Sequence, residues 1–133
     1  MNQAGREAVL EHYRRPKGYG LVEGFPVHSG TNPGCADQIN LQAGLQNGAL
    51  WLRFEAQGCA VSRATASILT SLLEASSPSE ARQILANFSA ALGGQECALP
   101  QDLADLVAFV RPAHRERCAL LPAHLAAEAL AEL

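Results

Sequence analysis

The sequence has little positive charge, few aromatic side chains and no long hydrophobic run, and these shortages exclude several classes of protein. Its 133 residues carry 10 Lys and Arg against 13 Asp and Glu, for a net charge of −3, so it offers DNA, RNA or an anionic membrane no general attraction. No apolar stretch approaches the roughly 20 residues of a membrane span, and charged residues interrupt the first 20 before a signal-peptide core could form. We expect a cytoplasmic protein with no nucleic acid and no membrane as partner.

The sequence also has no internal repeat and no low-complexity stretch, which excludes solenoid and fibrous architectures. Hydrophobic residues make up 48% of the chain and charged residues only 17%, as expected for a globular protein and not for a disordered one. A chain of this length buries most of the surface that its unfolded form exposes. We expect residues 1–133 to form a single domain.

The first half of the chain contains a β-hairpin pattern. Apolar residues alternate from Ile39 to Leu45 and again from Leu50 to Ala56, on either side of Asn47-Gly48. That dipeptide favours a type I′ turn between antiparallel strands. The pattern predicts a hairpin with one buried face, and a short edge strand is expected around Val27.

The second half has helical periodicity. Predicted helices cover residues 60–75, 78–92, 100–110 and 113–133, in addition to one at 6–14, and Pro122 is expected to break the last helix or to start a second segment. Strands followed by helices indicate an α+β fold, with a small antiparallel sheet of about three strands and helices packed on one face.

Four cysteines, at positions 35, 59, 97 and 118, are the main candidates for chemistry. In a reducing compartment they are expected to be free thiols, metal ligands or reactive groups instead of disulfides. Cys59 follows a predicted strand and precedes a helix, whose free amides would favour its thiolate. Gly58 allows the backbone to approach other groups closely there. The alternative is a small buried residue at a packed junction.

Two further segments place cysteines beside charged groups. Cys35 lies in the turn-forming "TNPGCAD", two residues before Asp37, although this carboxylate could merely cap the turn. Cys118 follows Arg115 by three positions, which would put the guanidinium near the sulfur, although Cys118 could equally be a core residue. Three thiols and one carboxylate could bind Zn²⁺ or an iron-sulfur cluster, but the separations of 24 and 59 residues exclude a zinc finger.

Four segments, in the same order, resemble the IscU/NifU-N/SufU family of iron-sulfur cluster scaffolds. "EHYRRPKGYG" is similar to "DHY-x-NPRN-x-G", "NPGCADQI" to "NPxCGDxI", and "GCAVSRATASIL" to "GCxISxASxS". "RERCALLPAHLAAEAL" resembles the final cysteine helix of the family. The family fold is the α+β arrangement expected above, and Ala36 stands where the family has glycine.

The SufU branch of this family is the most similar. Arg117 stands where IscU-type chains usually carry His, and "RPAHRE" departs from their "LPPVK" segment. SufU-like proteins have an arginine three residues before the final cysteine, as Arg115 is here. They also have a longer segment between the second and third motif cysteines, so a helical insertion is expected around residues 77–100.

The resemblance implies a function in iron-sulfur cluster biogenesis. Cys35, Asp37, Cys59 and Cys118 would be the metal ligands for Zn²⁺, and the protein would accept persulfide sulfur from a SufS-type cysteine desulfurase. Cys35 is the candidate sulfur acceptor, because its Pro-Gly turn moves more easily than a helix, and Arg115 would supply supporting charge. Such a protein is a sulfur carrier more than a conventional enzyme, and its further partners would be an iron-sulfur acceptor or Suf assembly proteins.

Three other functions stay open at this point. The same ligands could hold iron or assemble and transfer a [2Fe-2S] cluster. The metal could instead serve only to stabilise the fold. A Cys-His hydrolase is less well supported, because no histidine stands in a nucleophile motif. Cys97 has no counterpart in the family motifs and is expected to be a bystander.

Overall fold

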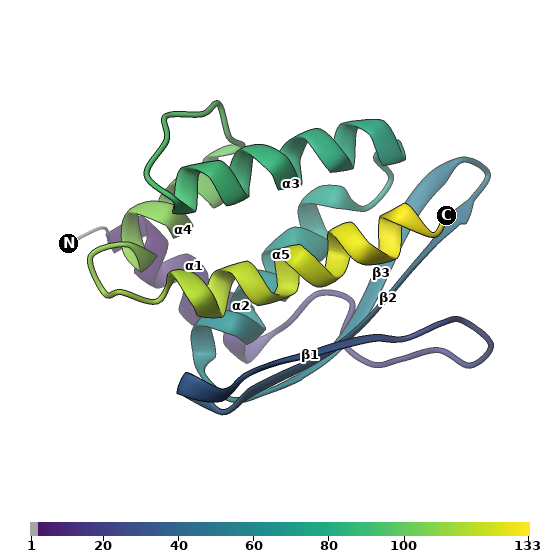
Figure 1. Cartoon of the computed structure of the whole chain (residues 1–133), viewed down its shortest axis with the longest axis horizontal. Coiled ribbons are helices and arrows are strands. Elements are labelled where there is room, and N and C mark those ends of the chain that lie inside the picture. Colours follow the sequence, from purple (N-terminus) through teal and green to yellow (C-terminus); the bar gives the residue numbers. More distant parts are fainter. Residues whose placement is uncertain (1–2) are drawn as a thin grey trace.

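A three-stranded antiparallel sheet forms one side of the molecule, and the helices pack on one face of this sheet (Figure 1). The structure is a computed structural model that describes residues 3–133. In these residues the elements are α1 (Gln3–Arg14), β1 (His28–Asn32), the 3-10 turn η1 (Pro33–Cys35), β2 (Asp37–Gln46), β3 (Ala49–Gln57), α2 (Ala60–Leu73), α3 (Pro78–Leu92), α4 (Gln101–Val110) and α5 (Glu116–Ala131). The predicted α+β fold, with helices on one face of a small sheet, is confirmed.

The central hairpin follows the predicted alternation. Strands β2 and β3 pair in antiparallel register, with Leu41 opposite Phe54, and both side chains are fully buried. Asn47 and Gly48 both have positive φ, at 54° and 79°, as a type I′ turn requires. Strand β1 pairs with the other edge of β2, which gives the sheet order β1-β2-β3.

Helices α2 and α5 pack directly on the sheet, and α1, α3 and α4 pack on those two helices. In Figure 1, α2 and α5 both begin near the end of the sheet at which η1 connects β1 to β2. The core between the layers is aliphatic and includes Ile39, Leu52, Ile68 and Leu69, each at most 1% exposed. Burial of each such side chain contributes about 1.5–3 kcal/mol to the stability of the fold. The ends of the strands and helices that carry the cysteines are therefore attached to a well-packed core.

The short edge strand expected around Val27 is present as β1, which begins at the next residue, His28. One predicted detail is wrong. Pro122 neither breaks nor starts a helix, since α5 continues through it from Glu116 to Ala131. Pro122 is buried, and tertiary packing there outweighs the roughly 3 kcal/mol that a proline costs inside a helix.

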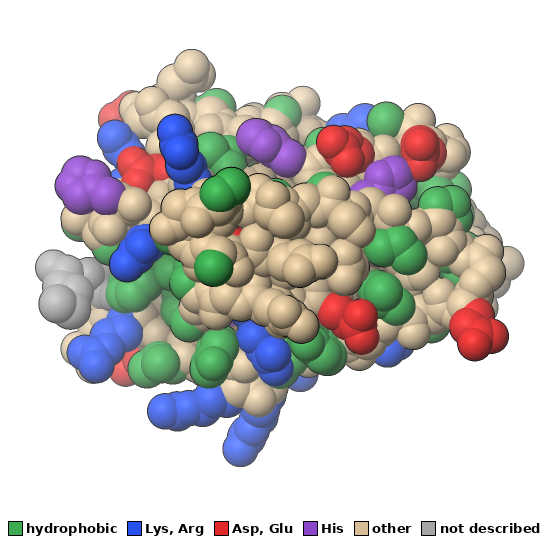
Figure 2. Space-filling view, turned by 60° about the horizontal axis from the view of Figure 1, so that its bottom comes forward, with side chains coloured by type: hydrophobic (Ala, Val, Ile, Leu, Met, Phe, Trp, Pro, Cys, Tyr) green, Lys and Arg blue, Asp and Glu red, His purple; other side chains and the backbone are tan. Residues whose placement is uncertain are grey.

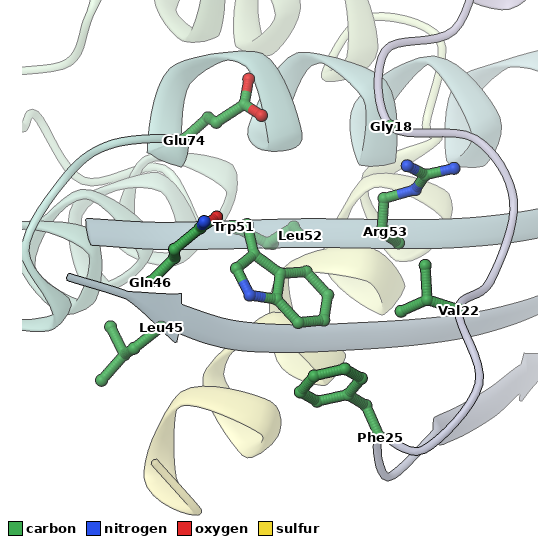
Figure 3. Close-up of a pocket in the computed structure, with 9 residues that line it drawn as sticks. All are labelled: Gly18, Val22, Phe25, Leu45, Gln46, Trp51, Leu52, Arg53 and Glu74. Atoms are coloured by element: carbon green, nitrogen blue, oxygen red, sulfur yellow. The ribbon is translucent and has the colours of Figure 1, made fainter. Parts of the chain in front are cut away.

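The face of the sheet away from the helices is covered by the segment between α1 and β1. The Gln42 side chain is 1% exposed and holds this segment by donating to the carbonyls of Val22 and Phe25 and accepting from the Val22 amide. The Phe25 and Trp51 rings meet edge to face, with centroids 4.8 Å apart. Beside them lies an open cavity of about 580 Å³ (Figure 3), and none of the predicted site residues lines it.

Helix α1 is joined to α2 by a polar contact that depends on a neutral histidine. The Ser67 hydroxyl accepts a hydrogen bond from the Lys17 backbone amide and lies 2.7 Å from Nδ1 of His12. With its own proton, the hydroxyl can donate only to an unprotonated Nδ1. Burial lowers the pKa of His12 below its usual 6.5, and the Lys17 charge adds to this effect, although the Asp102 and Glu11 carboxylates partly oppose it.

The protein is therefore expected to lose stability as the pH falls below about 6.5. The unfolded chain binds a proton at His12 more readily than the folded protein does. The contribution of neutral His12 to the free energy of unfolding is therefore full above the pKa of the unfolded state, and it is lost as the pH falls through the pKa of the folded state. Chemical denaturation at pH values between 7.5 and 5 should show that the free energy of unfolding decreases less for His12→Gln than for the wild type. His124→Gln, on an exposed part of α5, is the control, and equal pH dependence in all three proteins would contradict this assignment.

No helix among residues 3–133 is both long enough and apolar enough to span a bilayer.

Candidate metal centre

The turn between β1 and β2 carries two of the predicted ligands. Asn32 and Asp37 form the last residue pair of the two strands, and the 3-10 turn Pro33–Cys35 lies between them. Ala36 closes the turn in the left-handed conformation, with φ 54° and ψ 28°. Glycine adopts this conformation without strain, which explains why a glycine is typical of this motif position. The reversal places Cys35 at the surface end of the turn and buries Asp37 to 1% exposure.

The junction between β3 and α2 fixes the Asp37 carboxylate. The backbone amide of Cys59, the N-cap residue of α2, donates to Asp37 Oδ1 at 2.8 Å. Gly58 has φ 118°, and a Cβ built on it would meet Asp37 Oδ1 and lie 2.6 Å from the Asp37 Cα. The close approach expected at Gly58 is therefore an approach to the Asp37 backbone. Because Oδ1 accepts the hydrogen bond from the Cys59 amide, the other carboxylate oxygen, Oδ2, faces the thiols.

The third side chain comes from the first turn of α5. Cys118 is 1% exposed, and its thiol donates to Cys35 Sγ across 3.2 Å. The donor atoms of Cys35, Asp37 and Cys118 all lie within 4.8 Å of one another. Ligand atoms around a tetrahedral zinc ion lie about 3–4 Å apart, so these three are close to the spacing that such an ion requires.

Cys59 lies beside these three side chains and is the fourth predicted ligand. Its Sγ is 3.9 Å from Asp37 Oδ2, although it falls outside the group in which every donor lies within 4.8 Å of every other. The structure thus brings all four predicted residues to one place, three of them tightly.

Cys118 lies in surroundings that oppose a lone thiolate. Burial raises the pKa of its thiol, and hydrogen bonds with Cys35, Cys59 and Asp37 act in the same direction. A cation among these groups would reverse this preference, because it stabilises the anionic form of each ligand. Thiolates and a carboxylate are ligand types that zinc and iron accept, so these side chains could hold a metal ion.

Arg115 contacts a different sulfur from the one that its sequence position indicated. It precedes α5 as its N-cap residue, and its guanidinium donates to Cys35 Sγ at 3.4 Å. The expectation had placed it beside Cys118 on a shared helix face, but the helix begins only at Glu116. The supporting positive charge is therefore next to the candidate sulfur acceptor, on the solvent side of the cluster.

Asn32 is a member of the cluster that the sequence pattern did not single out. Its Nδ2 lies 3.4 Å from Asp37 Oδ2 and 3.7 Å from Cys118 Sγ, in a position that is only 7% exposed. An asparagine before a Pro-Gly turn is typical of turn formation. The sequence therefore indicates only this common role for Asn32 and does not indicate its contacts with Asp37 and Cys118.

The remaining thiol and the histidines lie outside this group in the described part of the chain. Cys97 is in the segment between α3 and α4, and the cluster of potential ligands in residues 3–133 contains no histidine. The hydrolase alternative therefore gains no support from the geometry.

Comparison with protein families accounts for nearly the whole chain. The NifU-like N terminal domain matches residues 4–131. The chain belongs to this family. The match includes all of the strands, the turn η1 and every helix from α2 to α5, so the cluster lies within the domain that defines the family. The predicted resemblance to IscU, NifU-N and SufU proteins is confirmed.

Two curated members of the NifU-like family show the range of the relatives. The chain is 30% identical to the zinc-dependent sulfurtransferase SufU of Bacillus subtilis (strain 168) over 105 residues, which are 78% of this chain and 71% of that protein. It is 28% identical to the iron-sulfur cluster assembly scaffold protein IscU of Streptococcus pyogenes serotype M1, over 98% of this chain and 84% of that protein. The chain is thus a member of the SufU and IscU group of iron-sulfur cluster assembly proteins.

Solved structures show the same NifU-like fold. A crystal structure described as a hypothetical protein has a TM-score of 0.84 at 26% identity and covers 98% of this chain and 99% of its own. The N-terminal part of a nitrogen-fixing NifU-like protein from Brucella abortus has a TM-score of 0.80 at 20% identity, over 95% of this chain and 91% of that one. A candidate scaffold protein for the SUF system of Fervidobacterium islandicum AW-1 also has a TM-score of 0.80, at 23% identity over 93% and 94%.

Proposed function

We propose that this protein binds one zinc ion through Cys35, Asp37, Cys59 and Cys118 and accepts persulfide sulfur from a SufS-type cysteine desulfurase. The observation that carries the proposal is the position of Cys35. Its thiol lies on a short turn, half-buried, against a buried Cys118 and Asp37. One ligand can therefore reach a partner while the others stay in place. The similarity to a zinc-dependent sulfurtransferase points in the same direction.

The donor set fits zinc. Three thiols and one carboxylate give four ligands of the types that zinc prefers, on secondary structure elements that the fold brings together. A bound zinc ion would supply positive charge that keeps the thiols deprotonated at neutral pH. The four ligands would carry up to four negative charges against two on the ion, and the Arg115 guanidinium next to Cys35 offsets part of the difference.

The transfer step is an exchange between a thiolate and a persulfide. The Cys35 thiolate attacks the terminal sulfur of the desulfurase cysteine persulfide and forms a new S–S bond. The S–S bond of the desulfurase breaks, and its cysteine leaves as a thiolate that takes the electron pair. The terminal sulfur keeps its proton, so Cys35 becomes a persulfide and no external oxidant or reductant is needed.

The surface charge is arranged unevenly around this chemistry. In Figure 2, Lys and Arg side chains gather toward the end of the molecule at which α2 and α5 begin in Figure 1, and several acidic side chains lie toward the C-terminal end. A positive surface attracts partners and anionic groups of opposite charge. We place this exchange in the cytoplasm, where thiols stay reduced, with iron-sulfur assembly proteins as the acceptors of the sulfur.

A desulfurase assay combined with metal analysis tests the proposal. The purified protein is expected to contain about one zinc per chain and to increase alanine formation from cysteine by a SufS-type enzyme at least tenfold. Cys35→Ser should lose the stimulation, because serine cannot form a persulfide, whereas Cys97→Ser should retain it. Equal stimulation by Cys35→Ser and the wild type would refute Cys35 as the acceptor.

Assembly of a [2Fe-2S] cluster is the second candidate function. It is favoured by the similarity to a scaffold protein over 98% of this chain, and thiolate sites that bind zinc also bind iron. Anaerobic reconstitution with iron and sulfide distinguishes the two functions. A stable cluster that moves to an apoprotein would favour the scaffold, and bound zinc with desulfurase stimulation would favour sulfur transfer. A purely structural zinc site would instead show unfolding on chelation and no effect on the desulfurase.

A further inference from the structure

Asn32 has a side chain turned toward two of the four candidate ligands. Its Nδ2 carries two hydrogen atoms, and it lies within hydrogen-bonding reach of both Asp37 Oδ2, at 3.4 Å, and Cys118 Sγ, at 3.7 Å. Asn32 is also paired with Asp37 in the β-ladder, so its backbone and its side chain both contact the same ligand. With 7% exposure, water is a poor substitute for these contacts.

Asn32 does not have the usual role of an asparagine at its position. It is the N-cap residue of η1, where an asparagine side chain commonly accepts a hydrogen bond from an amide of the following turn. Its side chain makes no such cap here. Since the local role is not used, the contacts to Asp37 and Cys118 account for the orientation of the side chain.

Three of the four candidate ligands consequently fall into two groups. Asp37 and Cys118 are each 1% exposed and share the neutral amide of Asn32. Cys35 is half-buried and accepts hydrogen bonds from the Cys118 thiol and, at the surface, from Arg115. An amide N–H stabilises carboxylate and thiolate without adding a charge. Groups that hold metal ligands in this way commonly change metal affinity 10- to 100-fold when they are removed.

We propose that Asn32 is a positioning residue that holds Asp37 and Cys118 together as the fixed part of the metal site and thereby makes Cys35 the ligand that exchanges. The inference rests on the proposed function, since it assumes that the four residues bind zinc. It assigns Asn32 no contact with the metal ion or with the transferred sulfur atom. Its effect is to set the order in which the ligands leave.

The test compares zinc-loaded wild type with Asn32→Ala. Zinc release to an excess of a chromophoric chelator should be about 10- to 100-fold faster in the variant. Alkylation by iodoacetamide, followed by mass spectrometry, should modify Cys35 well before Cys118 in the wild type. In Asn32→Ala, the rate at Cys118 should rise about tenfold, with a smaller change at Cys35, so that the two rates approach each other.

Two further variants separate positioning from a general loss of structure. Asn40→Ala, which removes an amide that lies elsewhere in the sheet and contacts Ser29, should release zinc at the wild-type rate. Asn32→Ser is measured beside Asn32→Ala, because its shorter side chain cannot reach both ligands but keeps the position polar if alanine disturbs the turn. Both Asn32 variants should keep the thermal midpoint of the metal-free wild type within a few degrees.

The outcomes distinguish this inference from the proposed function. Unchanged zinc release and unchanged alkylation order in the Asn32 variants, with a wild type that binds zinc, would overturn the role of Asn32 alone. Alkylation of Cys118 before Cys35 in the zinc-loaded wild type would also overturn it. A wild type that binds no zinc would refute the proposed function and this inference together.

Discussion

Replacement of Cys118 by serine is expected to lower zinc affinity at least about 100-fold and to abolish stimulation of the desulfurase. Structural zinc sites gain about 10–16 kcal/mol from metal binding, so one of four ligands accounts for about 3 kcal/mol, and 1.4 kcal/mol corresponds to a factor of ten. A serine hydroxyl stays protonated at neutral pH and is a weak zinc ligand. The affinity can be measured by competition with a chelator of known zinc affinity.

Cys97→Ser is the matched control for this substitution, because Cys97 is the one cysteine of the sequence that is not a candidate ligand. It should bind zinc as the wild type does. The metal-free Cys118→Ser protein should also unfold close to the metal-free wild type, since the two side chains have similar volumes. Wild-type affinity in Cys118→Ser would show that the metal is not held by α5.

Gly58→Ala is expected to be strongly disruptive, although Gly58 is not itself a candidate ligand. The added methyl group would meet Asp37 Oδ1 and lie 2.6 Å from the Asp37 Cα, and φ of 118° is in a region that alanine rarely adopts. The two penalties together should cost about 3 kcal/mol or more of unfolding free energy. The thermal midpoint should fall by roughly 10 °C, and zinc affinity should fall because Asp37 is displaced.

Gly24→Ala separates the cost of backbone strain from the cost of the steric clash. Gly24 also has a positive φ, of 91°, but a Cβ built there would have no atom within 4 Å. This variant should lose only about 1 kcal/mol, from backbone strain, and should keep full zinc affinity. If thermal unfolding and zinc titration gave equal losses for both variants, the close approach of Gly58 to Asp37 would have no special role.

Much of the fold follows from local sequence patterns. The alternation from Ile39 to Ala56 and the Asn47-Gly48 turn determine the hairpin and its register, because a shift by one residue would expose the buried face. The helix Pro78–Leu92 is predicted with its observed bounds, since Ser77 caps it and Glu80 follows at the capping-box position. Pro122 could not be predicted, because its helix is stabilised by burial against distant residues and not by local propensity.

The candidate site was predictable in its membership but not in its contacts. The residue types and the motif order point to Cys35, Asp37, Cys59 and Cys118, which the fold brings together from η1, β2, the N-cap of α2 and α5. The partner of Arg115 depends on where α5 begins, and sequence-based helix boundaries are uncertain by about two residues. The contact between Asn32 and Cys118 spans 86 positions in the chain, and no local pattern reports such a contact.

The left-handed Ala36 has a consequence for the conformational populations of the turn that carries Cys35. An L-residue with a Cβ is about 1 kcal/mol less stable in this region than glycine, which changes the equilibrium between turn conformers about fivefold. The contacts of Cys35 with Cys118 and Arg115 hold the turn closed. Under the proposed function, release of Cys35 from these contacts would let Ala36 leave the left-handed region, which alanine favours more strongly than glycine would. Sulfur loading and relaxation of the backbone at Ala36 would then be coupled equilibria.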